Sequence, residues 1–368
     1  MRRVKLSLLL TLAAALSLTT LSAAKPQKAQ KSEVKNVIFM IGDGMGLSQA
    51  TMMMVENGYE PTVFERVDNV ALIKTYSANN RVTDSAAAGT ALACGAKTNN
   101  KMLGLTPKLD TLHSMAKGAK AKGMSTGVVV ACAVQHATPA AFYAHVTDRN
   151  DNKTITEQLA KNDYIDIMIG GGETHFNKPA EGGTTMSKVA QSNGFNIVRN
   201  MDEFEAAGDG RILGLFTPGH IANFNKRGDY LPRATAEALK RLSKNKNGFF
   251  LMVEGSQIDW ACHSNDAKRC KGETADFCKT IEVAMDFADN NAGTLIVITA
   301  DHETGGLALV SGDEDFTKAD SGVEYTFSTK GHSGVMIPVY TYGAGAEQIN
   351  GVMDNTELSQ KIFKMIND

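Results

Sequence analysis

Short apolar runs alternate with helix-like segments along most of the chain. Runs such as NVIFMIG, TGVVVAC, FFLMVEG and TLIVITA are rich in Val, Ile and Phe, and several of them stop at Gly, Asp or Ser. Between the runs lie helix-like stretches such as LPRATAEALKRLSKN and TADFCKTIEVAMDFADNN. Continuous apolar strands that alternate with helices are typical of a parallel sheet covered on both faces. The pattern therefore predicts an α/β fold, a three-layer sandwich with a large, mostly parallel central sheet and helices on both faces.

The first residues follow a different pattern. MRRVK is basic, residues 6–21 are apolar and uncharged, and the small residues Ser22 and Ala24 follow. These features are typical of a secretory signal peptide, and the apolar run is short for a retained transmembrane helix. We therefore expect a signal peptide at 1–24, a polar tail at 25–35 and a single domain at 36–368. The mature protein should be exported, either periplasmic or secreted, with no membrane span.

Composition narrows the classes of function. The chain has 368 residues, 43% of them hydrophobic, and a formal net charge of -2, which offers no basic surface for nucleic acid. Its five cysteines are few and odd in number, so disulfides cannot form the framework of the fold. Whether Cys270 and Cys278 form a disulfide is undecided, although on one helix the two residues would lie too far apart.

Side chains suited to metal binding follow four of the apolar runs. These side chains are Asp43, Gln135, His136, Thr138, Glu254, Asp301 and His302. A lone Asp at such a place is usually a turn former or a helix cap. Because ligands gather at the carboxyl ends of parallel strands, four such positions together predict a site at that edge of the sheet.

Two local spacings indicate a metal centre. Asp259 and His263 are four residues apart in GSQIDWACHSND, so one helical turn would place both on the same face. Asp301 and His302 are adjacent in TADHETGG, and His332 lies among glycines in KGHSG. Histidine and carboxylate ligands without cysteine suit catalytic Zn²⁺. We expect surface or structural roles for the histidines that lack an acid at ligand spacing, which are His113, His145, His175 and His220.

Ser85 in TDSAAAGTA has two readings. Asp or Ser before a run of alanines is typical of an ordinary helix start. The alternative is a nucleophile, and because the chain has no Gly-x-Ser-x-Gly elbow, metal ions would have to activate it. Two divalent ions roughly 4 Å apart can serve a displacement at phosphorus. Arg149 in HVTDRND would then hold the non-bridging oxygens, unless it is a solvated loop residue.

Six motifs in this chain together resemble the bacterial alkaline phosphatase family. They are IGDGMG, TDSAAAGTA, QHATPAAFYAHVTDR, VEGSQIDWACH, TADHETGG and GHSG, and they run from about Asn36 to near the C-terminus. The resemblance implies metal-dependent hydrolysis of phosphate monoesters through a phosphoserine intermediate, which releases inorganic phosphate and an alcohol. It also implies two Zn²⁺ and one Mg²⁺ per subunit and a homodimer.

The resemblance also implies a role for each matched residue. Ser85 corresponds to the nucleophile and Arg149 to the phosphate-binding arginine, while Asp84 becomes a cap or a supporting group. The ligands of the first zinc correspond to Asp259, His263 and His332. Those of the second zinc correspond to Asp43, Asp301, His302 and Ser85. Those of the magnesium correspond to Asp43, Thr138 and Glu254.

Two positions depart from the enteric form of the family. His136 stands where that form has an Asp near the magnesium, and Trp260 stands where it has a Lys beside the phosphate. The identity and affinity of the third metal therefore stay open. A phosphodiesterase or sulfatase of the same superfamily, and an exported metal- or phosphate-binding protein without turnover, are the alternatives. Ser85 together with Thr138 and Glu254 favours monoester hydrolysis.

Overall fold

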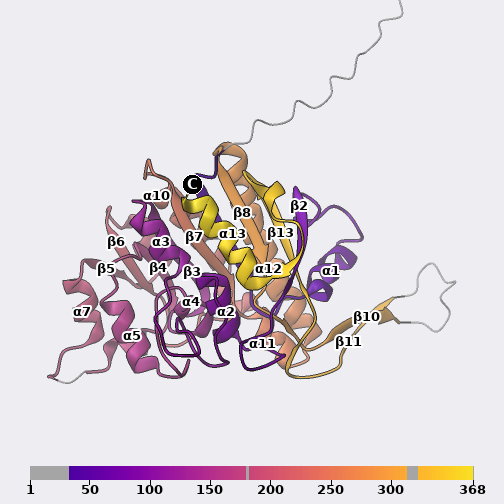
Figure 1. Ribbon diagram of the computed structural model, residues 1–368, viewed down its shortest axis with the longest axis horizontal. Helices are drawn as coiled ribbons and strands as arrows, with labels where there is room; N and C mark the ends of the chain where they lie inside the picture. The colour runs from indigo at the N-terminus through magenta and orange to yellow at the C-terminus, as the bar shows by residue number, and fades with distance from the viewer. Residues whose placement is uncertain (1–32, 180–181, 313–321, 368) are drawn as a thin grey trace, which may run out of the picture. The chain divides into compact units, whose positions relative to one another are not determined.

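One ten-stranded sheet runs through the chain in the computed structural model (Figure 1), which describes residues 33–179, 182–312 and 322–367. The strands lie in the order β14 (Gly351–Asp354), β2 (Asn69–Lys74), β13 (Ile337–Gly343), β8 (Thr294–Thr299), β1 (Asn36–Gly42), β7 (Phe249–Gly255), β3 (Ser125–Ala133), β4 (Ile167–Gly171), β6 (Arg211–Leu215) and β5 (Phe195–Val198). Only β13 runs antiparallel to its neighbours among these strands. The predicted mostly parallel sheet is confirmed.

The centre of the sheet is buried on both faces. Every residue of β1, β7 and β8 is buried, which explains why these segments read as unbroken apolar runs. In the register of the sheet, Ile38 of β1 lies between Leu251 of β7 and Ile296 of β8. Because the three strands are parallel neighbours, their carboxyl ends meet at one edge.

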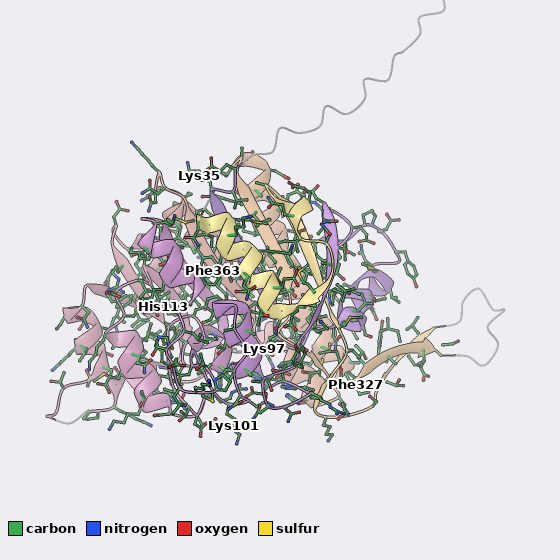
Figure 2. The ribbon with its side chains drawn as sticks, in the orientation of Figure 1. Lys35, Lys97, Lys101, His113, Phe327 and Phe363 are labelled. Carbon is green, nitrogen blue, oxygen red and sulfur yellow. The ribbon has the colours of Figure 1, made fainter. Side chains whose placement is uncertain are left out.

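Helices cover both faces, as predicted. One layer contains α1 (Leu47–Glu56), α10 (Tyr230–Leu242) and α12 (Ala267–Asn290), which contact one another or the central strands. The opposite layer, in front of the sheet in Figure 1, contains α2 (Ser85–Cys94), α3 (Met115–Ala121) and α13 (Asn355–Asn367). Phe363 of α13, labelled in Figure 2, packs on α3 at Gly118, where an added methyl group would lie 3.2 Å from the ring. The other helices are α4 (Ala137–Ala140), α5 (Asn152–Ala160), α6 (Glu173–Asn177), α7 (Met186–Ser192), α8 (Met201–Ala206), α9 (Phe224–Arg227), α11 (Ile258–His263) and the 3₁₀ helix η1 (Ala346–Gln348).

Two small antiparallel pairs lie outside the main sheet. β9 (Glu303–Thr304) pairs with β12 (His332–Ser333), which sets His332 opposite Thr304. β10 (Leu307–Ser311) pairs with β11 (Val323–Phe327), and Figure 1 shows this hairpin extending away from the sheet. The short pair brings the segment around His332 back to the end of β8.

The N-terminal predictions fall mostly outside the described residues. The expected signal peptide at 1–24 lies entirely outside them, as does most of the expected tail at 25–35. Within the described part of the chain, no helix has the length and apolar character needed to cross a membrane. All five cysteines are free thiols, and the sulfur of Cys270 lies 3.4 Å from that of Cys262 on α11.

Candidate active site

Buried acids and an imidazole converge where β1 and β8 end. Asp43 directly follows β1, and Asp301 and His302 follow β8. Nε2 of His302 lies 3.2 Å from Oδ2 of Asp301 and 3.6 Å from Oδ1 of Asp43. All three side chains are inaccessible to solvent. We call these three residues the strand-end cluster, which has the spacing of a metal site.

The chemistry of this cluster fits a divalent cation. Among the described residues, Oδ1 of Asp43, Oδ2 of Asp301 and Oε1 of Glu254 on β7 are buried without a hydrogen-bond partner. Burial, followed by the negative charge of Asp301, raises the pKa of Asp43 well above its ordinary value. Buried carboxylates left unpaired are strongly unfavourable, and a bound cation removes this penalty. Carboxylate and imidazole donors together suit Zn²⁺.

Ser85 is the first residue of α2 and points at this cluster. Its Oγ lies 3.2 Å from Nε2 of His302. Asp84 caps the helix, because its carboxylate accepts from the backbone N–H of Ala87 at 3.0 Å, and its other oxygen accepts from the backbone N–H of Lys101 at 3.0 Å. The N-terminal end of α2 therefore presents backbone N–H groups and the positive end of the helix dipole beside the serine hydroxyl. Ser85 begins a helix, as the first reading of TDSAAAGTA predicts, and its hydroxyl faces the candidate site, as the second reading requires.

Small residues let α2 approach the segment that carries Thr138. A methyl group added at Gly89 would lie 3.2 Å from Cβ of Ala141 and 3.6 Å from Cα of Thr138. Thr138 lies on α4, and its Oγ1 is 3.5 Å from Oδ2 of Asp43. Glycine at position 89 thus allows Thr138 and the strand-end cluster to lie close to the start of α2.

Asp259, His263 and His332 form a second cluster, which we call the helix cluster. α11 places Asp259 and His263 on one face, with Nε2 of His263 at 3.2 Å from Oδ2 of Asp259. Nε2 of His332 lies 3.2 Å from Nε2 of His263 and 3.6 Å from Oδ1 of Asp259. The Nδ1 atoms of the two histidines face backbone carbonyls, those of Lys330 at 2.5 Å and Thr83 at 2.8 Å. A carbonyl only accepts, so each Nδ1 donates and each Nε2 is directed to the shared space, as in metal-binding histidines.

Thr304 joins the two clusters, and the sequence analysis did not select it. Its Oγ1 lies 2.5 Å from Oδ1 of Asp259 and 3.2 Å from Nδ1 of His302. The rings of His302 and His332 also stack, with centroids 3.5 Å apart. Thr304 is two residues after His302 in TADHETGG, and this proximity was the available signal.

Arg149 lies between Asp84 and His136. Its Nη1 is 3.4 Å from Oδ2 of Asp84, and its Nη2 is 3.4 Å from Nε2 of His136. Because guanidinium only donates, Nε2 of His136 accepts this hydrogen bond. Burial, and then the charge of Arg149, lowers the pKa of His136 to about 3, so the imidazole is neutral. Arg149 is therefore oriented beside the start of α2 and is not a solvated loop residue.

Aromatic rings border the site next to His136. The ring of Trp260 packs edge-on against His136 at 5.7 Å and against His220 at 4.6 Å. His220, expected to be surface or structural, accepts from the backbone N–H of Ala133 through Nδ1 at 3.0 Å. His220 therefore has a structural role, as expected. It also lies beside the candidate site, which the sequence analysis did not predict.

A cysteine also belongs to the neighbourhood of the site. The sequence analysis assembled a ligand set without cysteine, yet Cys132, His136 and Glu254 form a third group with metal-site spacing. Cys132 is the eighth residue of β3 and was hidden in an apolar run, where it resembles any small hydrophobic residue. The sequence-predicted residues gathered at this edge of the sheet are Asp43, Ser85, His136, Thr138, Arg149, Glu254, Asp259, Trp260, His263, Asp301, His302 and His332.

Comparison with known proteins shows to which family this chain belongs. A family model for alkaline phosphatase matches residues 34–321. The chain belongs to the alkaline phosphatase family. It is 32% identical to alkaline phosphatase 4 of Bacillus subtilis, over 93% of this chain and 91% of that protein. It is 30% identical to the alkaline phosphatase of Escherichia coli, over 92% of this chain and 87% of that protein.

Solved structures of alkaline phosphatases have the same fold. The enzyme from the Antarctic bacterium TAB5 is 34% identical and superposes with a TM-score of 0.85, covering 92% of this chain and 99% of its own. A histidine-to-aspartate variant of that enzyme, with Mg bound in its M3 site, matches equally well. A cold-active alkaline phosphatase from Shewanella is 28% identical, with a TM-score of 0.82, and covers 90% of this chain and 99% of its own. The chain is thus a metal-dependent phosphoric monoester hydrolase.

Proposed function

We propose that this site hydrolyses phosphate monoesters through a phosphoserine formed on Ser85. The observation that carries the proposal is the position of Ser85 Oγ, 3.2 Å from Nε2 of His302 and at the N-terminal end of α2. A nucleophile, an anion-binding helix end and two sets of metal ligands are the parts that phosphoryl transfer requires. The products are inorganic phosphate and an alcohol.

We propose that the subunit holds two Zn²⁺ and one Mg²⁺. The helix cluster, Asp259, His263 and His332, would hold the first zinc. The strand-end cluster would hold the second zinc together with Ser85. The magnesium would be held by Asp43, Thr138 and Glu254. When bound, such cations lower the pKa of an oxygen nucleophile and neutralise negative charge on the leaving oxygen.

The other steps of the proposed reaction are carried out by side chains and backbone N–H groups of this chain. Ser85 Oγ forms a bond to phosphorus as the bond between phosphorus and the alcohol oxygen breaks, and the proton of the serine passes through solvent to the released alcohol. The planar guanidinium of Arg149 suits two non-bridging oxygens, and Asp84 orients it through the 3.4 Å ion pair. The N–H groups at the start of α2 add further donors to the phosphoryl group. Attack of water on phosphorus then breaks the bond to Oγ, one proton of that water returns to Oγ, and Ser85 and inorganic phosphate are formed.

We also propose a domain organisation, a location and an oligomeric state for this protein. Residues 36–368 would make a single catalytic domain, because β1 at its beginning and β14 near its end belong to the same ten-stranded sheet. Residues 1–24 would direct export to the periplasm or the medium, and 25–35 would remain as a polar tail. The proposal also includes a homodimer, which the resemblance to the family implies.

The competing functions predict different substrates. A phosphodiesterase or sulfatase would favour an aryl phosphate diester or an aryl sulfate over the aryl monoester. A binding protein without turnover would release no phosphate from p-nitrophenyl phosphate. Rates on the three substrates at equal enzyme concentration therefore separate these possibilities.

The decisive experiment removes the nucleophile. We expect Ser85→Ala to keep its zinc, measured by atomic spectroscopy, and to lose turnover of p-nitrophenyl phosphate by about 10³-fold or more. Ser243→Ala, at an exposed hydroxyl after α10, is the matched control and should behave as wild type. Undiminished turnover by Ser85→Ala would overturn the mechanism.

A further inference from the structure

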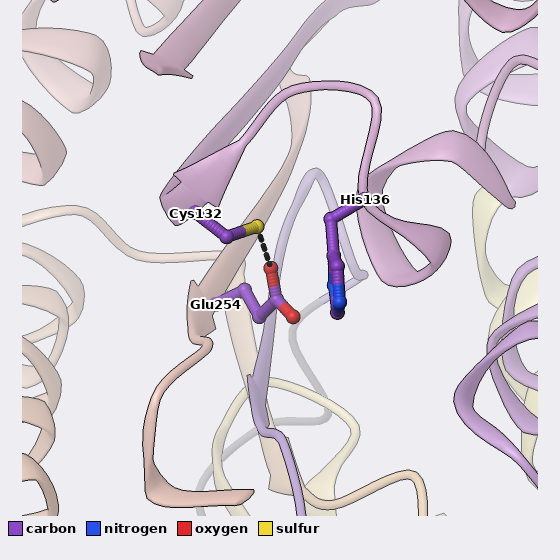
Figure 3. A group of neighbouring side chains, drawn as sticks. All are labelled: Cys132, His136 and Glu254. Atoms are coloured by element: carbon purple, nitrogen blue, oxygen red, sulfur yellow. Dashed lines mark hydrogen bonds between the residues drawn. The ribbon is translucent and has the colours of Figure 1, made fainter. Parts of the chain in front are cut away.

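Two buried thiols meet where α11 and α12 join. Sγ of Cys262, on α11, lies 3.4 Å from Sγ of Cys270, on α12, and neither side chain has solvent-accessible surface. The thiol of Cys132 is directed elsewhere, since its Sγ donates to Oε2 of Glu254 at 3.4 Å (Figure 3). We call Cys262 and Cys270 the helix-junction pair.

The turn between the two helices brings this pair together. Cys262 and Cys270 are eight positions apart, and a continuous helix would separate their Cα atoms by about 12 Å. Instead, Asn265 adopts the left-handed conformation, with a φ of 52°, and the carboxylate of Asp266 caps the start of α12. The chain therefore changes direction between the two cysteines, and their side chains meet.

Both residues of the helix-junction pair are thiols in this structure. We propose that they are oxidised to a disulfide in the mature protein. The sulfur atoms of a disulfide lie about 2.05 Å apart, so the two sulfurs have to approach by about 1.4 Å. The oxidant is a small-molecule disulfide such as glutathione disulfide. One cysteine loses its proton and attacks the oxidant, the second cysteine then attacks the mixed disulfide, and the oxidant leaves as two thiols that take up the two protons.

Burial determines when this reaction takes place. The folded protein shields both sulfurs from solvent, so the bond forms while the chain folds, before α11 has packed on α12. Exported proteins fold in compartments that permit disulfides. The proposed export therefore supplies suitable surroundings, but the pairing itself rests only on the positions of the two sulfurs.

A disulfide at this place supports the helix cluster. α11 has six residues and carries both Asp259 and His263, and Cys262 directly precedes His263. α12 has 24 residues and packs on α10. A bond from Cys262 to this long helix holds α11 in place before a metal binds, so the ligands lose less conformational freedom on binding. This consequence rests on the proposed zinc site, whereas the disulfide itself does not.

Refolding with a defined oxidant tests the pairing. The reduced, unfolded chain is refolded with glutathione and glutathione disulfide, unfolded again without reductant, alkylated and cleaved with trypsin. Lys268 lies between Cys262 and Cys270, and Lys271 lies between Cys270 and Cys278, so each of these cysteines falls in its own peptide. We expect the peptides of Cys262 and Cys270 to be joined and unlabelled. Alkylation of all five cysteines, or a bond between Cys270 and Cys278, contradicts the proposal. Protein isolated from the periplasm of an expression host gives the same test without refolding.

Thermal melting of the apoprotein measures the effect of the bond on stability. The wild type refolded with oxidant should melt at a higher temperature than the wild type refolded with reductant. Cys270→Ala should show no such difference. Cys278→Ala, on the same helix, is the matched control and should show the wild-type difference. A wild type whose melting temperature does not depend on the oxidant would contradict a stabilising disulfide.

Zinc release tests the link to the helix cluster. The oxidised wild type and oxidised Cys278→Ala should transfer zinc to a chelator more slowly than Cys270→Ala does. Equal rates in all three proteins contradict the supporting role of the disulfide. Hydrolysis of p-nitrophenyl phosphate by the same samples tests the proposed function separately, because a disulfide-linked protein without turnover would overturn that function and leave the disulfide in place.

Discussion

Thr304 sets the hydrogen-bonding state of His302. The threonine hydroxyl donates its one hydrogen to Oδ1 of Asp259 at 2.5 Å, so toward Nδ1 of His302, at 3.2 Å, it can only accept. Nδ1 of His302 therefore carries a hydrogen, and Nε2 is the ring nitrogen that faces Ser85, Asp43 and Asp301. One hydroxyl thus positions a ligand in each of the two candidate zinc sites.

Replacing Thr304 should weaken metal binding without removing a ligand. We expect Thr304→Val to lower zinc affinity by about 10–100-fold, the usual cost of losing a partner of a metal-binding histidine. Competition with a chelator measures the affinity, and turnover at saturating zinc should recover in large part. Thr304→Ser keeps the hydroxyl and should bind zinc as wild type does. Equal affinities for the Val and Ser variants would contradict the positioning role.

Replacing His136 by aspartate should change the response to magnesium. Aspartate adds an oxygen donor beside Glu254 and a negative charge beside Arg149, and Mg²⁺ prefers oxygen ligands. We expect His136→Asp to reach full activity at a lower Mg²⁺ concentration than the wild type. His136→Asn tests size without charge and should show a smaller effect. An unchanged magnesium titration would count against this interpretation.

The guanidinium of Arg149 should matter more than its charge. We expect Arg149→Lys to weaken inhibition by inorganic phosphate about tenfold, or roughly 1.4 kcal/mol, because a lysine cannot donate two parallel hydrogen bonds. The inhibition constant for phosphate and the KM for p-nitrophenyl phosphate measure the effect. Arg199→Lys, at a surface ion pair with Glu173, is the control. The prediction is wrong if both lysine variants bind phosphate as the wild type does.

A larger residue at position 89 should separate α2 from α4. The position lacks room, since even a methyl group would lie 3.2 Å from Cβ of Ala141. We expect Gly89→Val to lower the free energy of unfolding of the apoprotein by about 1–3 kcal/mol, the usual cost of overpacking. Urea denaturation measures this. Adding Ala141→Gly should restore part of the loss, and a double variant no better than the sum of the two singles would show that the contact is unimportant.

The bond between Tyr325 and Glu56 should give a pH-dependent contribution to stability. Oη of Tyr325 donates to Oε1 of Glu56 at 2.6 Å, and Nζ of Lys271 donates to Oε2 at 2.9 Å. These bonds, that of Tyr325 first, lower the pKa of Glu56 below its ordinary value of 4.5. The stabilisation is therefore complete above pH 4.5 and is lost as the pH falls through the lower pKa of the folded state.

Tyr325→Phe isolates this bond. At pH 7 we expect it to reduce the free energy of unfolding of the apoprotein by about 1 kcal/mol, a value discounted for solvent exposure. The difference from wild type should shrink once the pH is below 4.5. Tyr59→Phe, at a highly exposed phenol, is the control. A difference that is constant between pH 7 and pH 3 would contradict the role of the ionised carboxylate.

Much of the fold and part of the site can be predicted from sequence because burial leaves a direct trace. Strands covered on both faces must be apolar throughout, so β1, β7 and β8 are visible as unbroken runs. Polar residues at their ends, such as Asp43 and Asp301, then stand out. The strand order and the reversed direction of β13 leave no such trace, because they depend on how distant segments pair.

The residues missed by the sequence analysis do not stand out in the sequence pattern. Thr304 is one of many threonines, and only its two bonds to Asp259 and His302 distinguish it. Cys132 lies inside an apolar strand, where its sulfur can be read as packing. Such roles arise from three-dimensional neighbours that are far apart in sequence, so spacing along the chain carries little information about them.

The residues that meet at the candidate site lie far apart in the sequence, and this separation determines when the site can form during synthesis of the chain. The N–H of Gly44 donates to Oδ1 of Asp301, a partner 257 positions later, and His332 follows later still. A ribosome makes Asp43 early and the partners that complete its candidate metal site near the end. Because the central strand β1 must wait for both β7 and β8, a partly made chain has no complete centre to capture zinc. Metal acquisition should therefore be one of the last steps in maturation, and a truncated chain that ends before Asp301 should accumulate without zinc in the strand-end cluster.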